Sequence, residues 1–252
     1  MGMNGAASKG RILAAIDTAD LDAAAAQAAR LGKSVEGVKL GLEFYMAHGA
    51  PGYRKVAAAL AEATAVSGPA PIFLDLKFHD IPNTVAGAVR SVAPLQPLIL
   101  NVHASGGLAM LRAAADAAAE SAEKLKLRRA KVIAVTVLTS LDDVDLRRVG
   151  QSVPASDQVL RLADLTREAG LDGVVCSPQE IAPLRARFGN DFMLVTPGIR
   201  PEWAATGDQK RIMTPAEAVK AGADYLVIGR PITADRNPAE AATRIAAEIA
   251  AA

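Results

Sequence analysis

The chain has 252 residues, of which 51% are hydrophobic, a length that suits either two small domains or one large barrel. A formal net charge of +1 and the lack of a long basic run argue against nucleic acid or an anionic membrane as a partner and favour a small molecule. The single cysteine, Cys176, excludes an intramolecular disulfide framework, and the sequence has no run of about 20 apolar residues. We therefore expect a soluble cytoplasmic protein.

The elements alternate regularly along the chain. Residues 1–9 are small and polar and are expected to form a flexible tail before a single domain at 10–252. Strands are predicted at Arg11–Asp17, Val35–Gly41, Pro71–Lys77, Leu98–Ala104, Lys131–Thr139, Gly173–Ser177, Phe192–Thr196 and Tyr225–Gly229. The helices between and after them include Leu21–Leu31, closed by Gly32, then Leu108–Lys126 and Asn237–Ala250.

Repetition of strand then helix predicts an α/β protein whose parallel strands close into a single (β/α)8 TIM barrel. The competing architecture is a doubly wound open sheet. The first strand is followed by Thr18-Ala19-Asp20 rather than by the glycine fingerprint of a dinucleotide site, which disfavours that alternative.

Polar residues follow the apolar start of each predicted strand. They are Asp17, Lys39, Asp75 with Lys77, Asn101 with His103, Thr136 with Thr139, Ser177, Arg200, and Arg230 after Gly229. Arg200 is included because the seventh strand is taken to run on to it. In a TIM barrel the carboxyl ends of the strands meet on one face, where active sites are built. The pattern therefore predicts one pocket.

Four charges of alternating sign, on Lys39, Asp75, Lys77 and Asp80, are the most informative group. Asp75 and Lys77 share one face of an extended strand, and Pro82 places Asp80 on the loop that leaves it. An ammonium held beside carboxylates can protonate a developing carbanion, and the carboxylates disfavour a further anionic group. This chemistry suits loss of a carboxylate. The alternative is a structural ion-pair network, which four such groups at neighbouring strand ends argue against.

A phosphate site is predicted in the last quarter of the chain. Gly229 allows close approach of an anion to the backbone, and Arg230 supplies a planar donor fork, with Arg200 as a second donor. Loops after strands seven and eight are the recurring phosphate site of this fold. Residues 198–213, which include Gln209, form a connection long enough for a lid, and a solvated loop is the alternative.

These motifs together resemble the short, monofunctional bacterial type of the orotidine 5′-monophosphate decarboxylase family. The resemblance spans Arg11 to the C-terminus and rests on five segments: Asp75–Thr84 (DLKFHDIPNT), Asn101–Gly107 (NVHASGG), Val135–Ser140 (VTVLTS), Thr196–Arg200 with Gly207–Gln209, and Ile228–Ile232. It implies a carboxy-lyase of de novo pyrimidine biosynthesis that converts orotidine 5′-monophosphate to UMP and carbon dioxide, with no metal or organic cofactor.

The resemblance also implies roles for individual residues. Lys77 protonates C6 of the pyrimidine, Asp75 lies beside the substrate carboxylate, and Lys39 and Asp80 complete the charged array. The remaining contacts it implies are Asp17 and Lys39 to the ribose, Thr139 to the pyrimidine ring, and Arg200, Gln209, Gly229 and Arg230 to the phosphate. Asp80, Ile81 and Thr84 are donated across the interface of a homodimer, so that two subunits share each active site.

Two other functions fit the same scaffold. The first is a magnesium-dependent keto-sugar-phosphate decarboxylase or hexulose-phosphate synthase. In those enzymes strand two carries an acidic metal ligand, whereas here it carries Lys39, whose charge repels a divalent cation. The second is an inactive phosphoribosyl-nucleotide binding module, which is expected to lack the four charges present here.

Overall fold

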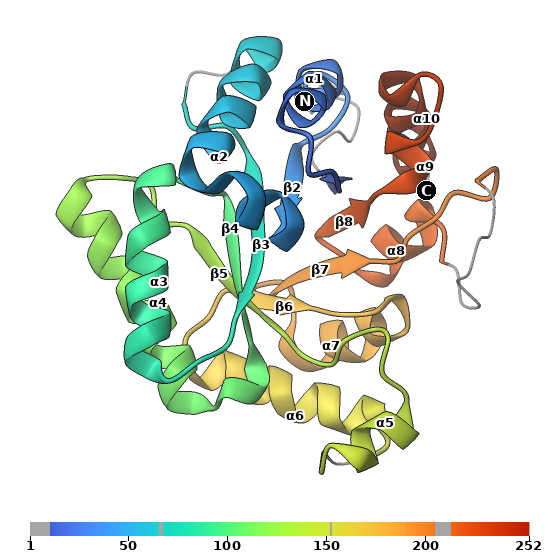
Figure 1. The fold of residues 1–252 in the computed structure, drawn as a ribbon. Coiled ribbons are helices and arrows are strands. Elements are labelled where there is room, and N and C mark those ends of the chain that lie inside the picture. Colours follow the sequence, from blue (N-terminus) through green and yellow to red (C-terminus); the bar gives the residue numbers. More distant parts are fainter. Residues whose placement is uncertain (1–10, 66–67, 152, 205–212, 252) are drawn as a thin grey trace, which may run out of the picture. The chain divides into compact units, whose positions relative to one another are not determined.

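The computed structural model describes residues 11–65, 68–151, 153–204 and 213–251 (Figure 1). The expected tail at 1–9 and the predicted phosphate ligand Gln209 lie outside these ranges.

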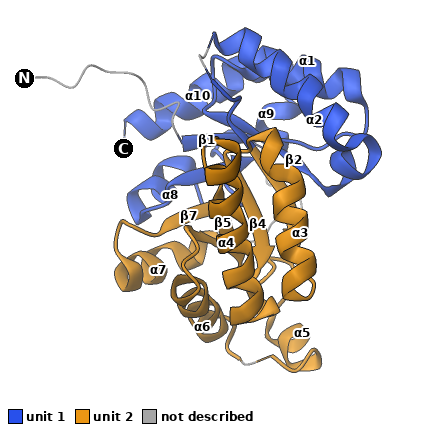
Figure 2. Ribbon diagram, turned by 90° about the vertical axis from the view of Figure 1, so that its left-hand side faces the viewer, with its two compact units in different colours: residues 1–72, 197–252 blue, residues 73–196 orange. Residues whose placement is uncertain are grey.

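Eight parallel strands form a closed barrel in which each strand neighbours the next in sequence, which confirms the predicted TIM barrel. The strands are β1 (Ile12–Ile16), β2 (Gly37–Gly41), β3 (Ile72–Phe78), β4 (Ile99–His103), β5 (Lys131–Val135), β6 (Gly173–Val175), β7 (Met193–Pro197) and β8 (Tyr225–Ile228). The chain also divides into two compact units, residues 1–72 with 197–252 and residues 73–196 (Figure 2). The single domain expected at 10–252 stays a prediction.

The first unit is built on β1 and its two neighbours. Ala15 pairs with Lys39 of β2, and Ala14 pairs with Ile228 of β8. The helices of this unit are α1 (Leu21–Leu31), α2 (Leu42–Thr64), α8 (Pro215–Ala221), α9 (Arg230–Thr233) and α10 (Pro238–Ala250). At Gly37 an added Cβ would lie 2.0 Å from the carbonyl oxygen of Pro71, so only glycine allows this close approach of backbones.

The second unit carries the strands from β3 to β7, with each described pair in parallel register. Its helices are α3 (Pro82–Val92), α4 (Leu108–Leu125), α5 (Asp143–Arg148), α6 (Ala155–Glu168) and α7 (Ile181–Phe188), with short 3-10 helices η2 (Ala93–Leu95), η3 (Ala104–Gly106) and η4 (Pro178–Glu180). Helices α3 and α4 pack against each other, each burying one apolar face, as amphipathic helices outside a sheet do.

Two strand ends differ from the sequence prediction by three residues or more. The fifth strand ends at Val135 instead of Thr139, because its neighbour β6 is short and its last residue, Val175, pairs with Val135. Thr139 therefore lies in an exposed turn. The seventh strand ends at Pro197 instead of reaching Arg200, and beyond it Ile199 makes only an isolated bridge with Met213.

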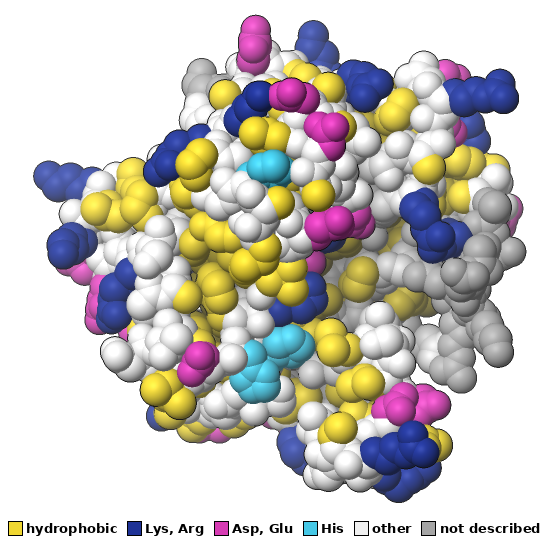
Figure 3. All heavy atoms as spheres, in the orientation of Figure 1, with side chains coloured by type: hydrophobic (Ala, Val, Ile, Leu, Met, Phe, Trp, Pro, Cys, Tyr) yellow, Lys and Arg dark blue, Asp and Glu magenta, His cyan; other side chains and the backbone are white. Residues whose placement is uncertain are grey.

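The surface is mixed in charge on the face drawn in Figure 3, where Lys and Arg side chains are interspersed with Asp and Glu and form no continuous basic patch. Within the described part of the chain, no helix combines the length and apolar character that crossing a membrane requires.

Candidate active site

A short ion pair lies at the carboxyl end of β3. The Nζ atom of Lys77 is 2.6 Å from Oδ1 of Asp75, and the two side chains are 30% and 11% exposed. Strand β3 begins with Ile72, Phe73 and Leu74, which are all buried, so the strand changes from core to charge within a few residues. Separating the ammonium from the nearly buried Asp75 carboxylate would leave that carboxylate without a compensating charge. The cost of such a separation holds the Lys77 ammonium in place.

The backbone at Lys77 is in the left-handed region, with φ of +51°. The pairing of β3 with β4 shifts at this point: Leu74 pairs with Leu100, but Phe78 pairs with Val102, so β3 carries extra residues in a bulge. A left-handed conformation costs a non-glycine residue about 1–2 kcal/mol, and such strain persists where surrounding contacts impose it. The Lys77 ammonium therefore reaches Asp75 from a bulged strand end and not from an extended one.

Asn101 on β4 connects both residues of this pair. Its Nδ2 atom donates to Oδ1 of Asp75 at 2.7 Å, and its Oδ1 atom accepts the backbone N–H of Lys77 at 2.8 Å. Asn101 is 1% exposed, so its side-chain amide is shielded from water. We name Asp75, Lys77 and Asn101 the β3–β4 cluster.

Two histidines adjoin this cluster. The rings of His79 and His103 are in contact, with centroids 5.3 Å apart. Burial lowers the pKa of His103, and the nearby His79 and Lys77 lower it further, against the opposing effect of Asp75. His103 is thus neutral near pH 7, and it adds no positive charge beside Lys77.

Asp80 lies on the exposed loop after β3, as predicted from Pro82, which is the first residue of α3. Its Oδ1 atom accepts the backbone N–H of Ile81 at 2.6 Å. Ile81 is 66% exposed, an unusual position for a large apolar side chain, and Thr84 is also exposed. These three residues form one accessible surface at the start of α3.

In the first unit, Asp17 and Lys39 form a second ion pair at 3.2 Å between Oδ1 and Nζ. Lys39 lies within β2, and Asp17 directly follows β1, so the side chains meet where two adjacent strands end. The Lys39 side chain is 12% exposed and Asp17 is 66% exposed, which leaves the carboxylate open to a ligand.

Gly229 and Arg230 lie at the end of β8, next to this pair. A Cβ added at Gly229 would lie 3.9 Å from Oδ2 of Asp17, and the Gly229 carbonyl accepts the N–H of Ile232 at the start of α9. Arg230 is exposed, whereas Arg200, the second predicted phosphate donor, is 7% exposed. A short helix after strand eight is the usual place of the phosphate site in this fold.

The described residues contain no group of three or more His, Cys, Asp or Glu arranged to hold a metal ion.

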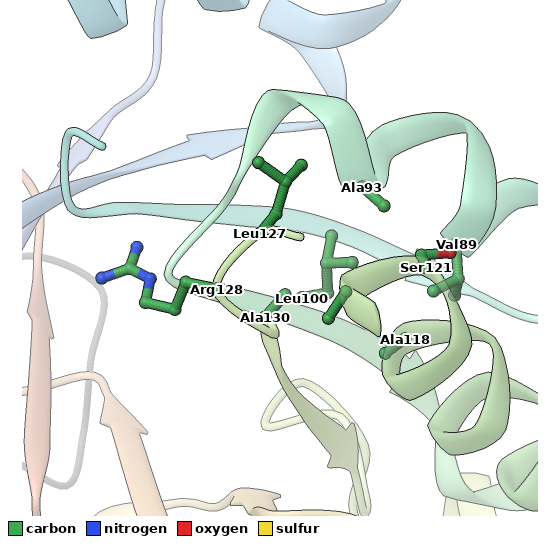
Figure 4. Close-up of a pocket in the computed structure, with 9 residues that line it drawn as sticks. Val89, Ala93, Leu100, Ala118, Ser121, Leu127, Arg128 and Ala130 are labelled. Atoms are coloured by element: carbon green, nitrogen blue, oxygen red, sulfur yellow. The ribbon is translucent and has the colours of Figure 1, made fainter. Parts of the chain in front are cut away.

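A small apolar hollow lies elsewhere in the second unit, between α3, α4 and the segment before β5 (Figure 4). Val89, Ala118 and Leu127 line it, and the side chain of Arg128 points away from it. Leu100 of β4 also lines this hollow, whereas its neighbour Asn101 contacts Asp75, as the alternation of side chains along a strand requires. Apart from Ser121 and Arg128, the residues that line the hollow are apolar.

The strand-end pattern placed Asn101 in the predicted pocket but assigned it no role there. A signal was present: an amide within the buried run Ile99–His103 needs hydrogen-bond partners, and the charged residues of β3 are the nearest source. That Asn101 bonds to the backbone of Lys77 could not be read from the sequence, because it depends on the bulge in β3.

Comparison with known proteins shows which family the chain matches. Residues 10–245 match the model of the orotidine 5′-phosphate decarboxylase / HUMPS family. The chain is 57% identical over 238 residues to the orotidine 5′-phosphate decarboxylase of Rhodospirillum rubrum, covering 94% of this chain and 93% of that protein. It is 51% identical to the enzyme of the same name from Moorella thermoacetica, covering 96% of this chain and 93% of that protein.

Among solved structures, the orotidine 5′-phosphate decarboxylase of Lactobacillus acidophilus superimposes with a TM-score of 0.79 at 34% identity, covering 95% of this chain and 98% of that one. The match extends over nearly the whole chain, including the segments that carry both ion pairs. This chain belongs to the orotidine 5′-phosphate decarboxylase / HUMPS family.

Proposed function

We propose that this protein decarboxylates orotidine 5′-monophosphate to UMP without a metal ion. The observation that carries the proposal is the ion pair of Lys77 and Asp75 at 2.6 Å, at the carboxyl end of a barrel strand. The curated relatives named orotidine 5′-phosphate decarboxylase, at 49–57% identity over most of the chain, support this activity over that of the magnesium-dependent branch.

In the proposed reaction the bond between C6 of the pyrimidine and its carboxylate carbon breaks, and the electron pair remains on C6. Carbon dioxide leaves, and a proton of the Lys77 ammonium is transferred to C6, after which water reprotonates the amine. The ammonium, already fixed by Asp75, stabilises the negative charge that develops on C6 without having to reorganise. The Asp75 carboxylate repels that of the substrate, an effect relieved when carbon dioxide departs.

We propose further that Asp17 and Lys39 act on the same substrate as Asp75 and Lys77. All four belong to carboxyl-terminal parts of strands, or directly follow them, in one closed barrel, the end at which TIM-barrel sites lie. Asp17 and Lys39 would hold the ribose hydroxyls, and Gly229 and Arg230 the phosphate. Thr139, Arg200 and Gln209 stay predictions for the pyrimidine ring and the phosphate.

A homodimer with shared active sites completes the proposal. Asp80, Ile81 and Thr84 would reach the partner subunit's substrate. This is supported by the exposure of all three, including an apolar side chain that a monomer would leave 66% exposed. The cytoplasmic location and the absence of nucleic-acid or membrane partners stay predictions.

The test is a spectrophotometric assay of the purified protein with orotidine 5′-monophosphate and excess EDTA. We expect the pyrimidine absorbance to change to that of UMP at the same rate with and without the chelator. A reaction that needs added Mg²⁺ would contradict the metal-independent mechanism, and an unchanged spectrum would contradict the decarboxylase proposal as a whole.

A further inference from the structure

Asn101 uses both ends of its side-chain amide within the β3–β4 cluster. The Oδ1 atom of Asp75 receives two donors, Nζ of Lys77 at 2.6 Å and Nδ2 of Asn101 at 2.7 Å. The Oδ1 atom of Asn101 accepts the N–H of Lys77 at 2.8 Å. The three residues thus close a ring of hydrogen bonds that passes through both the side chain and the backbone of Lys77.

This ring of hydrogen bonds supplies a partner for a backbone N–H group at the bulge in β3. Where the register of β3 shifts, the N–H of the left-handed Lys77 is bonded to a side chain instead of to a carbonyl of the neighbouring strand. A buried N–H needs a partner, and the Asn101 oxygen supplies one that lies on the strand next to β3. The same amide fixes the carboxylate toward which the Lys77 side chain then bends.

We infer that Asn101 is a positioning residue that holds the Lys77 ammonium and the Asp75 carboxylate at their working separation. This inference rests on the proposed decarboxylation for its effect on turnover, but the hold on the Lys77 backbone exists without substrate. The role needs a neutral group with a donor and an acceptor in one plane, which alanine lacks and an ionised carboxylate does not provide.

The first test is Asn101→Ala. We expect kcat to fall by about 100-fold, because displacement of a reacting group by about 1 Å has an effect of that size. KM should change by less than about threefold, since the amide has both polar ends bonded within the cluster and is 1% exposed. A kcat equal to that of the wild type, or a loss confined to KM, would overturn the inference.

Asn101→Asp gives a second test in which the side chain keeps its size, so the fold does not have to accommodate a cavity. The neighbouring titratable groups are Asp75 and Lys77 on β3 and His103, which follows on β4 and contacts His79. In this variant a protonated carboxyl group would imitate the amide, whereas the ionised carboxylate would face that of Asp75. Burial and the like charge of Asp75 raise the pKa of the introduced carboxyl group against the opposing effect of the Lys77 ammonium, so kcat relative to wild type should fall as pH rises from about 5 to about 8. A constant ratio would contradict the proposed role.

The third measurement requires no substrate. Amide hydrogen exchange by NMR should show the Lys77 N–H exchanging at least about tenfold faster in Asn101→Ala, while Leu74, earlier on the same strand, is unchanged. Thr166→Val is the matched control, because it removes another buried hydrogen bond of this unit, from Oγ1 to the carbonyl of Leu162 at 2.7 Å, outside the cluster. It should leave kcat and Lys77 exchange unaltered.

The outcomes separate the two proposals. If the wild type is inactive but Lys77 exchange accelerates in Asn101→Ala, the decarboxylase proposal fails and the hold of Asn101 on Lys77 stands. If the wild type is active and neither turnover nor exchange responds to Asn101→Ala, the inference about Asn101 fails and the decarboxylase proposal stands.

Discussion

Lys77 combines a strained backbone with an ammonium fixed against a carboxylate. Its φ of +51° and its 2.6 Å contact with Asp75 occur at the same residue, so the bulge in β3 and the position of the ammonium cannot be changed independently. Strain of this kind is common where a side chain has to be aimed at a reacting atom.

Replacement of this lysine tests its chemical role. Lys77→Ala should lower kcat by about 10³-fold or more, because positioned proton donors contribute about 10²–10⁴-fold and the ammonium also stabilises the carbanion. Lys55→Ala is the matched control, since Lys55 is likewise paired, with Asp22, but lies on α2. Steady-state kinetics on folded protein, checked by circular dichroism, measure both; equal kcat values for the two variants would refute the role of Lys77.

A second residue, Asp172, should govern stability in acid. Burial acts to raise its pKa, but hydrogen bonds from Arg129, Lys131 and the Val132 amide outweigh burial, and the pKa lies below its ordinary value. A carboxyl group whose pKa is lower in the folded state stabilises the fold above its unfolded pKa of about 3.9, and this contribution is lost as pH falls through the folded value.

The prediction is that the free energy of unfolding decreases below about pH 4 and that Asp172→Asn makes this decrease shallower. Urea denaturation at a series of pH values measures it, with Asp116→Asn, an exposed aspartate on α4, as control. An identical acid slope for wild type and Asp172→Asn would show that Asp172 does not govern stability in acid.

At the scale of elements, most of the barrel could be predicted because each strand is a short apolar run bounded by polar or turn residues. Helix α1 has the predicted bounds, since Asp20 caps it and the alanines Ala24, Ala25 and Ala28 define its buried face. The ends of β5 and β7 were predicted too far along, because a strand ends where its neighbour no longer offers a pairing partner, and the local sequence does not encode that.

The site was predictable to a similar extent. The residues Asp75 and Lys77 were found from alternation along an extended strand, and they do meet, although by way of a bulge that alternation does not foresee. The link through Asn101 was missed because it joins two strands, and one of its bonds goes to a backbone group that carries no sequence signal.

The cap of α1 gives a prediction at this scale. The Asp20 side chain accepts the N–H of Ala23 at 2.9 Å, so Asp20→Ala should reduce the free energy of unfolding by about 0.5–2 kcal/mol. Chemical denaturation measures the change, with Asp116→Ala as a control that removes an exposed aspartate from the interior of α4. A change no larger than that of the control would show that the cap contributes little.

For the whole molecule, the central question is whether one subunit completes a site. If Asp80 serves the partner subunit's site, Lys77→Ala and Asp80→Ala homodimers are each inactive, but a mixed dimer carries both lesions in one site and none in the other. After random exchange of equal amounts, activity should approach about one quarter of the wild-type value, because half of the symmetric dimers are mixed and each has one intact site. No recovery, despite exchange demonstrated with a tagged subunit, would mean that each site is built within one chain.

The most direct test of the proposed proton transfer is to incubate the protein with orotidine 5′-monophosphate in D2O with EDTA and to examine the product by NMR. Transfer of an exchangeable Lys77 proton to C6 predicts UMP that carries deuterium at C6, together with one carbon dioxide for each substrate consumed. Recovery of unchanged substrate, or of UMP with hydrogen at C6, would contradict it.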